Sequence, residues 1–197
     1  KNDNYFVCMR LCSIQDNRFA YRKNVLPTSM HPSQAALIVS LAKPYLKETA
    51  QIMDPFCGVG TLLIERAHLV PAREIYATDT YGDAITMGRE NAEFAKTRIN
   101  FIHRDFFDFR HDYKFDELIT DMPVRNRQTK AEMELFYERF FDKAAEHLVS
   151  GGIIVMYSNE IGFVKKQIRL RVEYRLLQET CILDKKDFYL FVIRYED

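Results

Sequence analysis

Residues 52–65 combine the residue types that bind a nucleotide-like ligand. A short apolar run ends in Asp54, two glycines follow, and an apolar stretch with helical spacing begins after Thr61. This order is typical of a strand, a tight loop and the start of a helix. Gly58 and Gly60 can adopt positive φ and let a ligand approach the backbone, and Thr61 is expected to help cap the helix, whose free N–H groups face the loop. The stretch predicts a site for a nucleotide or a nucleotide-like cofactor.

Four acidic residues fall at the ends of successive β-prone segments, namely Asp54, Asp79, Asp105 and Asp121. A single acid at a strand end usually caps a turn. Four in series form a pattern, because ligands of open α/β sheets bind beyond the carboxyl ends of the strands. We therefore expect these carboxylates to lie along one edge of a sheet.

The segments that must position these acids alternate between helix and strand patterns. Strands are predicted at 51–53, 74–79, 99–103, 115–120, 152–157, 172–183 and 188–195, and helices at 34–43, 62–70, 82–97, 131–148 and 161–168. Ser33 is the expected N-cap of the first helix, and Ser150–Gly152 the stop of the fourth. The alternation predicts βαβ units and a parallel sheet, and the last two strands an antiparallel hairpin. Residues 5–12 and 19–22 are predicted to form a further hairpin.

Two common nucleotide sites fit the glycine loop poorly. The dinucleotide fingerprint G-x-G-x-x-G needs a third glycine, but Leu63 stands at that position. The Asp54 carboxylate would also repel a pyrophosphate. A P-loop is excluded because no G-K-[ST] follows. An acid before the loop suits a cofactor that carries positive ammonium and sulfonium groups.

Composition bounds the class of protein. The formal net charge of the 197 residues is zero, so overall charge does not indicate a nucleic-acid partner. Four cysteines occur without a C-x-x-C pair or histidines at zinc spacing, which predicts reduced thiols, a cytoplasmic protein and no metal. No apolar run reaches the roughly 18–20 residues of a membrane span, and no signal peptide is visible.

The motif Asp54-Pro55-Phe56-Cys57-Gly58-Val59-Gly60-Thr61 resembles the D-P-F-C-G-[ST]-G-T signature of class I S-adenosylmethionine-dependent methyltransferases. It is most similar to the THUMP-associated family, which methylates guanine N2 in RNA. Residues 30–33 resemble the H-P-[AS] segment of that family, and residues 121–123 its D/N-x-P-[FY] catalytic motif. The resemblance covers residues 25–197. It implies a Rossmann-like α/β fold: a mostly parallel seven-stranded sheet with a C-terminal antiparallel β-hairpin and helices on both faces.

The resemblance implies S-adenosyl-L-methionine as cofactor and assigns residues to it. Asp54 would lie near the ammonium, Asp79 at the ribose hydroxyls and Asp105 at the adenine amino group, with Phe106 a candidate to pack on the ring. The remaining residues implied at the methionine end are Thr28, His31, Phe56, Cys57, Gly58, Gly60 and Thr61.

The resemblance also implies a catalytic turn and an RNA substrate, either tRNA or rRNA. The Asp121 carboxylate and the Met122 carbonyl would accept the hydrogens of the exocyclic amine, and Pro123 would fix the turn. Val124 replaces the aromatic residue that the family has after this proline. The basic residues that follow are candidates to hold RNA phosphates or to stack on the base: Arg125, Arg127 and Lys130.

Other interpretations stay open. The chain is either an RNA guanine-N2 methyltransferase, a methyltransferase for another amine or amide (DNA, protein or small molecule), or a catalytically impaired module that binds cofactor or RNA. The chain is expected to divide into two parts. Residues 1–24 would be a β-rich appendage, or the linker from a THUMP-like domain upstream, and residues 25–197 the methyltransferase domain.

Overall fold

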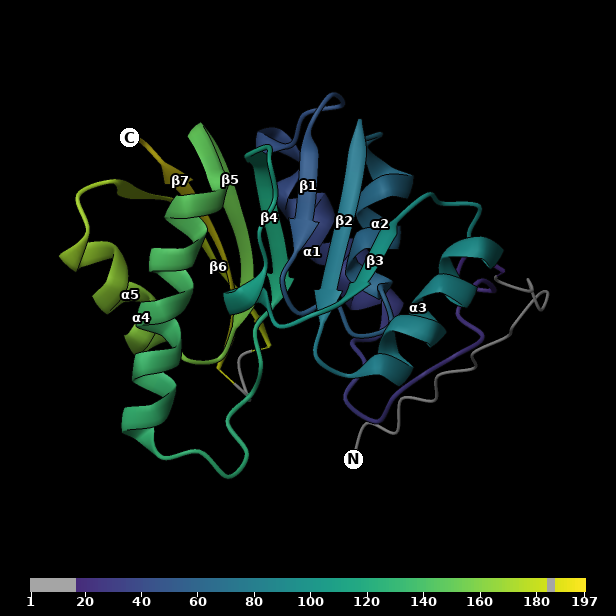
Figure 1. Ribbon diagram of the computed structural model, residues 1–197, viewed down its shortest axis with the longest axis horizontal. Helices are drawn as coiled ribbons and strands as arrows, with labels where there is room; N and C mark the ends of the chain where they lie inside the picture. Colours follow the sequence, from purple (N-terminus) through teal and green to yellow (C-terminus); the bar gives the residue numbers. More distant parts are fainter. Residues whose placement is uncertain (1–16, 184–186) are drawn as a thin grey trace, which may run out of the picture.

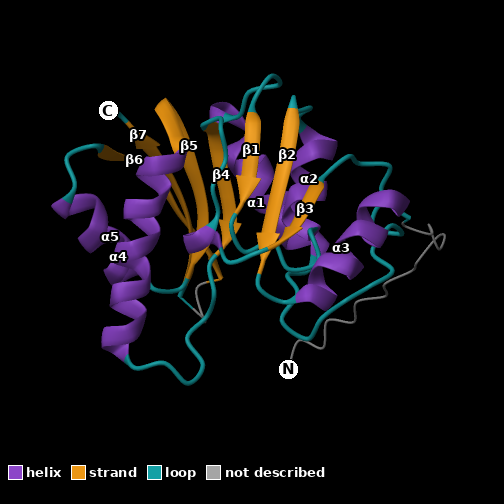
Figure 2. Cartoon of the chain, in the orientation of Figure 1, coloured by secondary structure: helices purple, strands orange, loops and turns teal. Residues whose placement is uncertain are grey.

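The computed structural model describes residues 17–183 and 187–197. Its centre is a seven-stranded sheet with the strand order β3-β2-β1-β4-β5-β7-β6 (Figures 1 and 2). The strands are β1 (Gln51–Asp54), β2 (Glu74–Asp79), β3 (Asn100–His103), β4 (Phe115–Asp121), β5 (Leu148–Ser158), β6 (Tyr174–Leu183) and β7 (Phe188–Tyr195). Strands β1 to β5 are parallel, and β7 runs antiparallel between β5 and β6. The predicted fold class is confirmed.

Helices cover both faces of the sheet, as predicted. They are α1 (Pro32–Ala42), α2 (Thr61–Leu69), α3 (Gly82–Phe94), α4 (Lys130–His147) and α5 (Ile161–Leu170), with short 3-10 turns η1 (Lys43–Tyr45) and η2 (Phe106–Asp108). Helices α1, α2 and α3 contribute to one apolar core, and α4 and α5 to the other. The core under α4 is aromatic and includes Phe106, Phe115, Phe140, Phe141 and Phe191.

The topology creates one switch point. The chain leaves β1 toward β2 and later returns to pair β4 with the other side of β1. Loops that leave neighbouring strands in opposite directions open a crevice beyond the strand ends. The arrowheads of β1, β2 and β4 point to this edge in Figure 1. The strands end in Asp54, Asp79 and Asp121.

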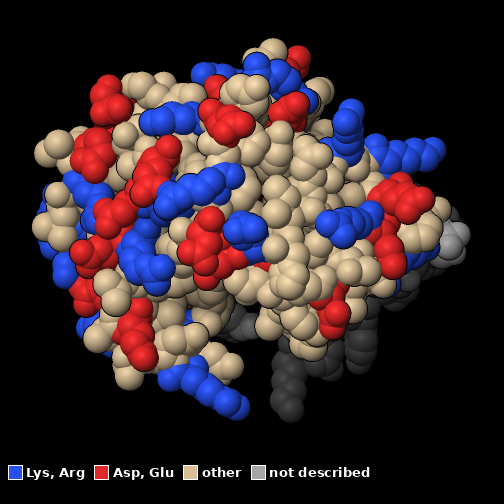
Figure 3. All heavy atoms as spheres, viewed as in Figure 1, with Lys and Arg blue, Asp and Glu red and all other residues tan. Residues whose placement is uncertain are grey.

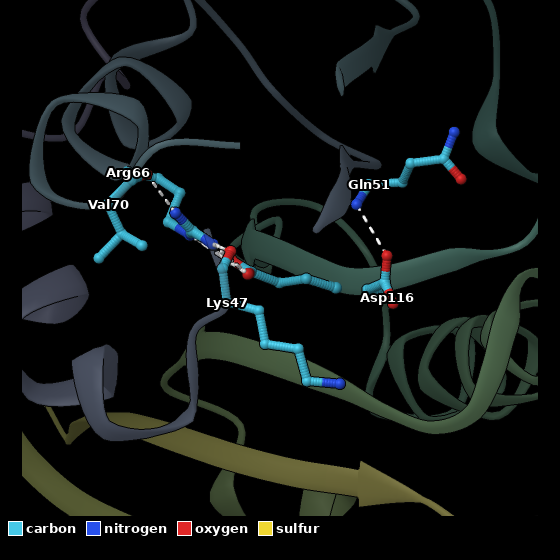
Figure 4. Close-up of polar contacts among 6 residues, drawn as sticks. Lys47, Gln51, Arg66, Val70 and Asp116 are labelled. Atoms are coloured by element: carbon cyan, nitrogen blue, oxygen red, sulfur yellow. Dashed lines mark hydrogen bonds and ion pairs between the residues drawn. The ribbon is translucent and has the colours of Figure 1, made fainter. Parts of the chain in front are cut away.

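A buried ion pair holds the opposite edge together (Figure 4). Arg66 of α2 is fully buried and donates to Glu117 of β4, with Nη2 to Oε2 at 2.8 Å and Nε to Oε1 at 2.9 Å. The same guanidinium donates to the carbonyl oxygens of Val70 and Lys47 at 2.6 and 3.1 Å. Every partner is therefore a full or partial negative charge, which offsets the desolvation of the guanidinium.

Residues 17–31, here called the strap, cross α2 and α3 before α1 begins. The buried Asn91 of α3 accepts from the backbone N–H of Asn24 at 2.9 Å and donates to the Asn24 carbonyl at 3.0 Å. Its amide also lies 3.3 Å from the Val59 carbonyl oxygen. Arg22 donates to the Met30 carbonyl at 2.9 Å. These bonds place the end of the strap against the glycine loop.

The structure corrects four local predictions. Residues 19–22 lie in a turn and not in a strand; the other half of the predicted hairpin lies outside the described residues. His31, not Ser33, caps α1, because its side chain accepts from the Ser33 backbone N–H and Pro32 occupies the first turn. Thr61 does not cap α2, whose N-cap is Gly60 in the left-handed region.

The fourth correction concerns the junction of α4 and β5. The helix ends at His147 and Leu148 already belongs to β5, although a helix to 148 and a strand from 152 were predicted. Leu148 is fully buried and pairs with Phe115, so tertiary packing decides the boundary. The expected stop signal lies inside the strand, where Gly151 has a φ of 79°.

Across residues 17–183 and 187–197, no helix combines the length and apolar character needed to cross a membrane.

Candidate active site

A cavity of about 370 Å³ lies beyond the ends of β1, β2 and β4. It is called the central cavity here. Its walls come from three segments that are distant in the sequence: the strap, the glycine loop (residues 55–60) and the turn after β4. Of the predicted site residues it is lined by Thr28, Asp54, Phe56, Cys57, Gly58, Thr61, Asp79, Asp121, Met122 and Pro123.

The two glycines of the loop have different tasks. Gly58 lines the cavity with a φ of 50°, and a Cβ added there would meet nothing within 4 Å. Its backbone is therefore open to a ligand. Gly60 has a φ of 79°, and a Cβ there would lie 2.8 Å from the ring of Phe101. Gly60 does not line the cavity, so the structure gives it a packing role.

Asp79 ties the glycine loop to the end of β2. One carboxylate oxygen accepts from the Gly58 N–H at 2.8 Å, and the other from the Tyr81 N–H at 2.9 Å. The Cys57 N–H donates to the Thr78 carbonyl at 3.0 Å. The loop is thus fixed before any ligand binds, while the Asp79 carboxylate still faces the cavity.

Two further carboxyl groups in the cavity have raised pKa values. Burial raises the pKa of Asp54 to about 8; the Phe56 N–H, which donates to it at 3.0 Å, opposes this rise, and the carboxylates of Asp121 and Asp79 add to it. Burial also raises the pKa of Asp121 to about 7. A cationic ligand would stabilise the charged form of both groups.

A buried hydroxyl also lacks a partner. Oγ1 of Thr61 lies at the cavity wall and has no hydrogen-bond partner among the residues described here. Buried polar groups are normally paired, so an orphan at a cavity indicates a ligand atom. Together with the open backbone of Gly58 and the two carboxyl groups, it fits a ligand that carries cationic and polar groups, as S-adenosylmethionine does.

The turn after β4 is held by the neighbouring strand. Asp121 pairs with Tyr157 of β5, and the Met122 N–H donates to the Tyr157 carbonyl at 2.9 Å. Within the described part of the chain no group forms a hydrogen bond with the Asp121 carboxylate. Pro123 and Val124 are exposed at the rim of the cavity. The turn therefore presents an unpaired carboxylate beside the glycine loop.

Several predicted site residues lie outside the cavity. The Asp105 side chain accepts from the Phe107 N–H at 2.9 Å and caps η2. Phe106 is only 1% exposed, with its ring centroid 6.0 Å from that of Phe56 and 5.9 Å from that of Phe140. The Phe106 ring therefore lies in the aromatic core and not among the residues that line the cavity.

His31 and the basic residues that follow the turn 121–123 also lie outside the cavity. The His31 ring is exposed and caps α1. Arg125, Arg127 and Lys130 are exposed and do not line the cavity. The cavity is also lined by residues that the sequence analysis did not assign to the site, namely Leu26, Ser29, Met30, Val59, Leu62, Val124 and Asn126. Leu26 and Ser29 match no motif, and the bonds of Asn91 to Asn24 and Val59 hold this part of the strap beside the glycine loop.

Fold and site define a class I S-adenosylmethionine-dependent methyltransferase domain. The model of the RMKL-like methyltransferase domain family matches residues 20–180, and the chain belongs to this family. Its cofactor class follows from the family and the fold.

The chain is 31% identical over 187 residues to tRNA (guanine(10)-N2)-dimethyltransferase of Methanothermobacter thermautotrophicus, covering 89% of this chain and 54% of the relative. It is 26% identical to release factor glutamine methyltransferase of Lactococcus lactis, covering 69% of this chain and 56% of that protein. Among solved structures, TrmN from Thermus thermophilus superposes with a TM-score of 0.74 at 22% identity, covering 91% and 52% of the two chains. The chain thus spans about half the length of these relatives.

Proposed function

We propose that this domain transfers a methyl group from S-adenosylmethionine to the exocyclic N2 of a guanine in tRNA or rRNA, in the cytoplasm. The observation that carries the proposal is the turn Asp121-Met122-Pro123, whose unpaired carboxylate shares one cavity with the glycine loop. The relative from Methanothermobacter, named for guanine-N2 methylation of tRNA, supports the substrate.

S-adenosylmethionine, when bound, supplies an electrophilic methyl group. Asp54, Gly58, Thr61 and Asp79 would hold it. Asp105, which does not line the cavity itself, would contact the adenine end of the cofactor. Thr28 would close the methionine end.

The chain's own task is to activate the amine. The lone pair of guanine N2 is delocalised into the ring, so the nitrogen is a poor nucleophile. The Asp121 carboxylate and the Met122 carbonyl would accept its two hydrogens and localise the lone pair. A carboxylate with a pKa raised to about 7 can also take the proton that the nitrogen releases. Arg125, Arg127 and Lys130 would hold nearby phosphates.

A side-chain amide is a second candidate substrate. The chain is similar to the release factor glutamine methyltransferase of Lactococcus lactis, and an amide nitrogen has a delocalised lone pair like that of guanine N2. The same pair of acceptors would serve it. A peptide with a central glutamine therefore belongs in the assay beside RNA.

The test is methyl transfer from radiolabelled S-adenosylmethionine to unmodified tRNA transcripts, to an rRNA transcript, and to that peptide, with mass analysis of the product nucleosides. We expect N2-methylguanosine from RNA. Asp121→Asn should lower the rate about 100-fold or more, the size of loss found when one stabilising group of a transition state is removed. Cofactor affinity, measured by calorimetry, should stay within about 3-fold.

The matched control is Asp112→Asn, which makes the same change at an exposed acid outside the cavity. It should retain full activity. An Asp121→Asn variant that works at the wild-type rate would refute the mechanism. Product on the peptide alone would favour the amide substrate. Cofactor binding without transfer to any acceptor would favour an impaired module.

A further inference from the structure

A second cavity adjoins the catalytic turn. It has a volume of about 530 Å³ and lies between the start of α4, the length of α5 and the loop after β4. It is called the α4–α5 groove here. Its charged lining consists of four cations, Arg125, Lys130, Lys166 and Arg169, and two acids, Glu134 and Glu160. The fold thus brings together basic residues some 40 positions apart in the sequence.

One residue separates this groove from the central cavity. Val124 and Asn126 line the central cavity, and Arg125 between them lines the groove. Neighbouring Cα atoms are only about 3.8 Å apart. Residues 124–126 are therefore a narrow ridge with a site on each side. The backbone of a nucleotide whose base enters the central cavity can cross this ridge and reach the groove.

The cations of the groove are available to a polyanion. Lys130 and Arg169 form no ion pair with any acid in the ranges 17–183 and 187–197. Arg125 pairs loosely with Glu160, with Nε 3.7 Å from Oε1, and Lys166 pairs with Glu134. Such exposed pairs contribute little and can exchange an acid for a phosphate. The lining keeps two net positive charges.

The surface on the α4 side of the molecule has mixed charge (Figure 3). Figure 3 shows acidic and basic side chains interspersed over the side of the molecule that carries α4. Such a surface gives no broad field of one sign, which agrees with the zero net charge of the chain. Attraction for a polyanion must therefore be local.

We propose that the α4–α5 groove binds the backbone phosphates of the RNA strand next to the target nucleotide. This inference rests on the proposed function and adds a site on α5, Lys166 and Arg169, to the substrate path. Phosphate contacts fix the register of a nucleic acid and carry no base specificity. The groove would hold the strand while the base is presented to Asp121.

The test compares two double variants that remove the same charge. Lys166→Gln with Arg169→Gln removes cations of the groove. Lys165→Gln with Arg175→Gln is the control, since Lys165 pairs with Glu179 of β6 at 2.8 Å and neither residue lines the groove. The probe is a fluorescein-labelled pool of unmodified tRNA transcripts, bound by the whole chain over a series of salt concentrations.

We expect the groove variant to bind about 10-fold more weakly at low salt. The slope of log affinity against log salt should shrink by about 1.5, since each phosphate contact contributes about 0.7–0.9. The KM for RNA should rise, while S-adenosylmethionine affinity stays unchanged. The control variant should behave as wild type.

Equal losses of RNA affinity in both double variants would overturn the groove proposal, since the lower net charge alone would then explain them. The groove proposal would also be overturned if the wild type methylates RNA and the groove variant has the same salt slope and the same KM for RNA. That outcome would leave the proposed function intact. A wild type that binds S-adenosylmethionine but neither binds nor methylates any RNA would refute the proposed function, and the groove with it.

Discussion

At the scale of single residues, the site combines one buried carboxyl group, Asp54, with two half-buried ones, Asp79 and Asp121. Asp54 is 1% exposed, and Asp121 shares its cavity. Both have raised pKa values, about 8 and about 7, chiefly because burial disfavours their charged forms. Their ordinary value in an unfolded chain is about 3.9. Folding therefore favours their protonation.

This sets the direction of a pH dependence in the ligand-free domain. A raised pKa in the folded state stabilises the protein below about pH 4, and this contribution is lost as the pH rises through 7 to 8. We expect Asp54→Asn to remove much of this loss of stability at high pH. The difference in free energy of unfolding between variant and wild type, from urea titrations, should move in favour of the variant by about 3 kcal/mol from pH 5 to pH 8.5.

Taking the difference between variant and wild type cancels the contributions of the other titrating groups to the free energy of unfolding. One of these is His147, whose pKa is lowered to about 4 and whose contribution has the opposite sign. A difference that stays flat across this range would show that Asp54 is charged in the folded domain.

How much of the site the sequence predicts depends on what positions each residue. Asp54, Asp79 and Asp121 were predictable because parallel strands bring their ends to one edge. The burial of Phe106 was not predictable, because the direction of its ring depends on packing in the aromatic core. Met30 was not, because its place at the cavity depends on hydrogen bonds of the strap.

At the scale of elements, the glycine loop depends on a strand that is not part of the site. The ring of Phe101 on β3 fills the space beside Gly60, and a Cβ on Gly88 of α3 would lie 2.6 Å from the same ring. Two elements thus approach β3 through glycines. The helix and strand patterns were predictable from periodicity, but this three-way contact was not, since no local pattern records it.

Two glycines with the same φ of 79° allow a matched test. Gly151→Ala adds a Cβ that meets nothing within 4 Å, so it should cost only the left-handed penalty of about 1–2 kcal/mol. Gly60→Ala carries that penalty and overlaps Phe101, which should add about 1–3 kcal/mol. Thermal and urea unfolding of both variants measures the contrast. Equal losses would mean that Phe101 moves aside freely.

At the scale of the whole molecule, the edge opposite the site is joined by Arg66 and Glu117. The pair links α2, β4 and the segment that enters β1, through Lys47. Removing one partner of a buried pair leaves an uncompensated charge, so Arg66→Met should cost about 3–5 kcal/mol. The double variant Arg66→Met with Glu117→Leu should recover part of that loss, because both charges are then absent while the Val70 and Lys47 carbonyls still lack their donor.

A double-mutant cycle from urea unfolding gives the coupling. Cofactor affinity should be unchanged in the folded variants, since neither residue lines the central cavity. Strictly additive losses would show that the two side chains act independently.

The ridge of residues 124–126 has a consequence for the ancestry of such domains. In the proposed function, the groups that would hold the methyl donor follow β1 and β2, whereas the segment that would face the acceptor leaves from β4. Mutation in the segment after β4 can thus change the acceptor without touching the donor half. A lineage can then diversify its substrates on an inherited donor site. That is a physical reason why one chain resembles both an enzyme named for tRNA and one named for a release factor.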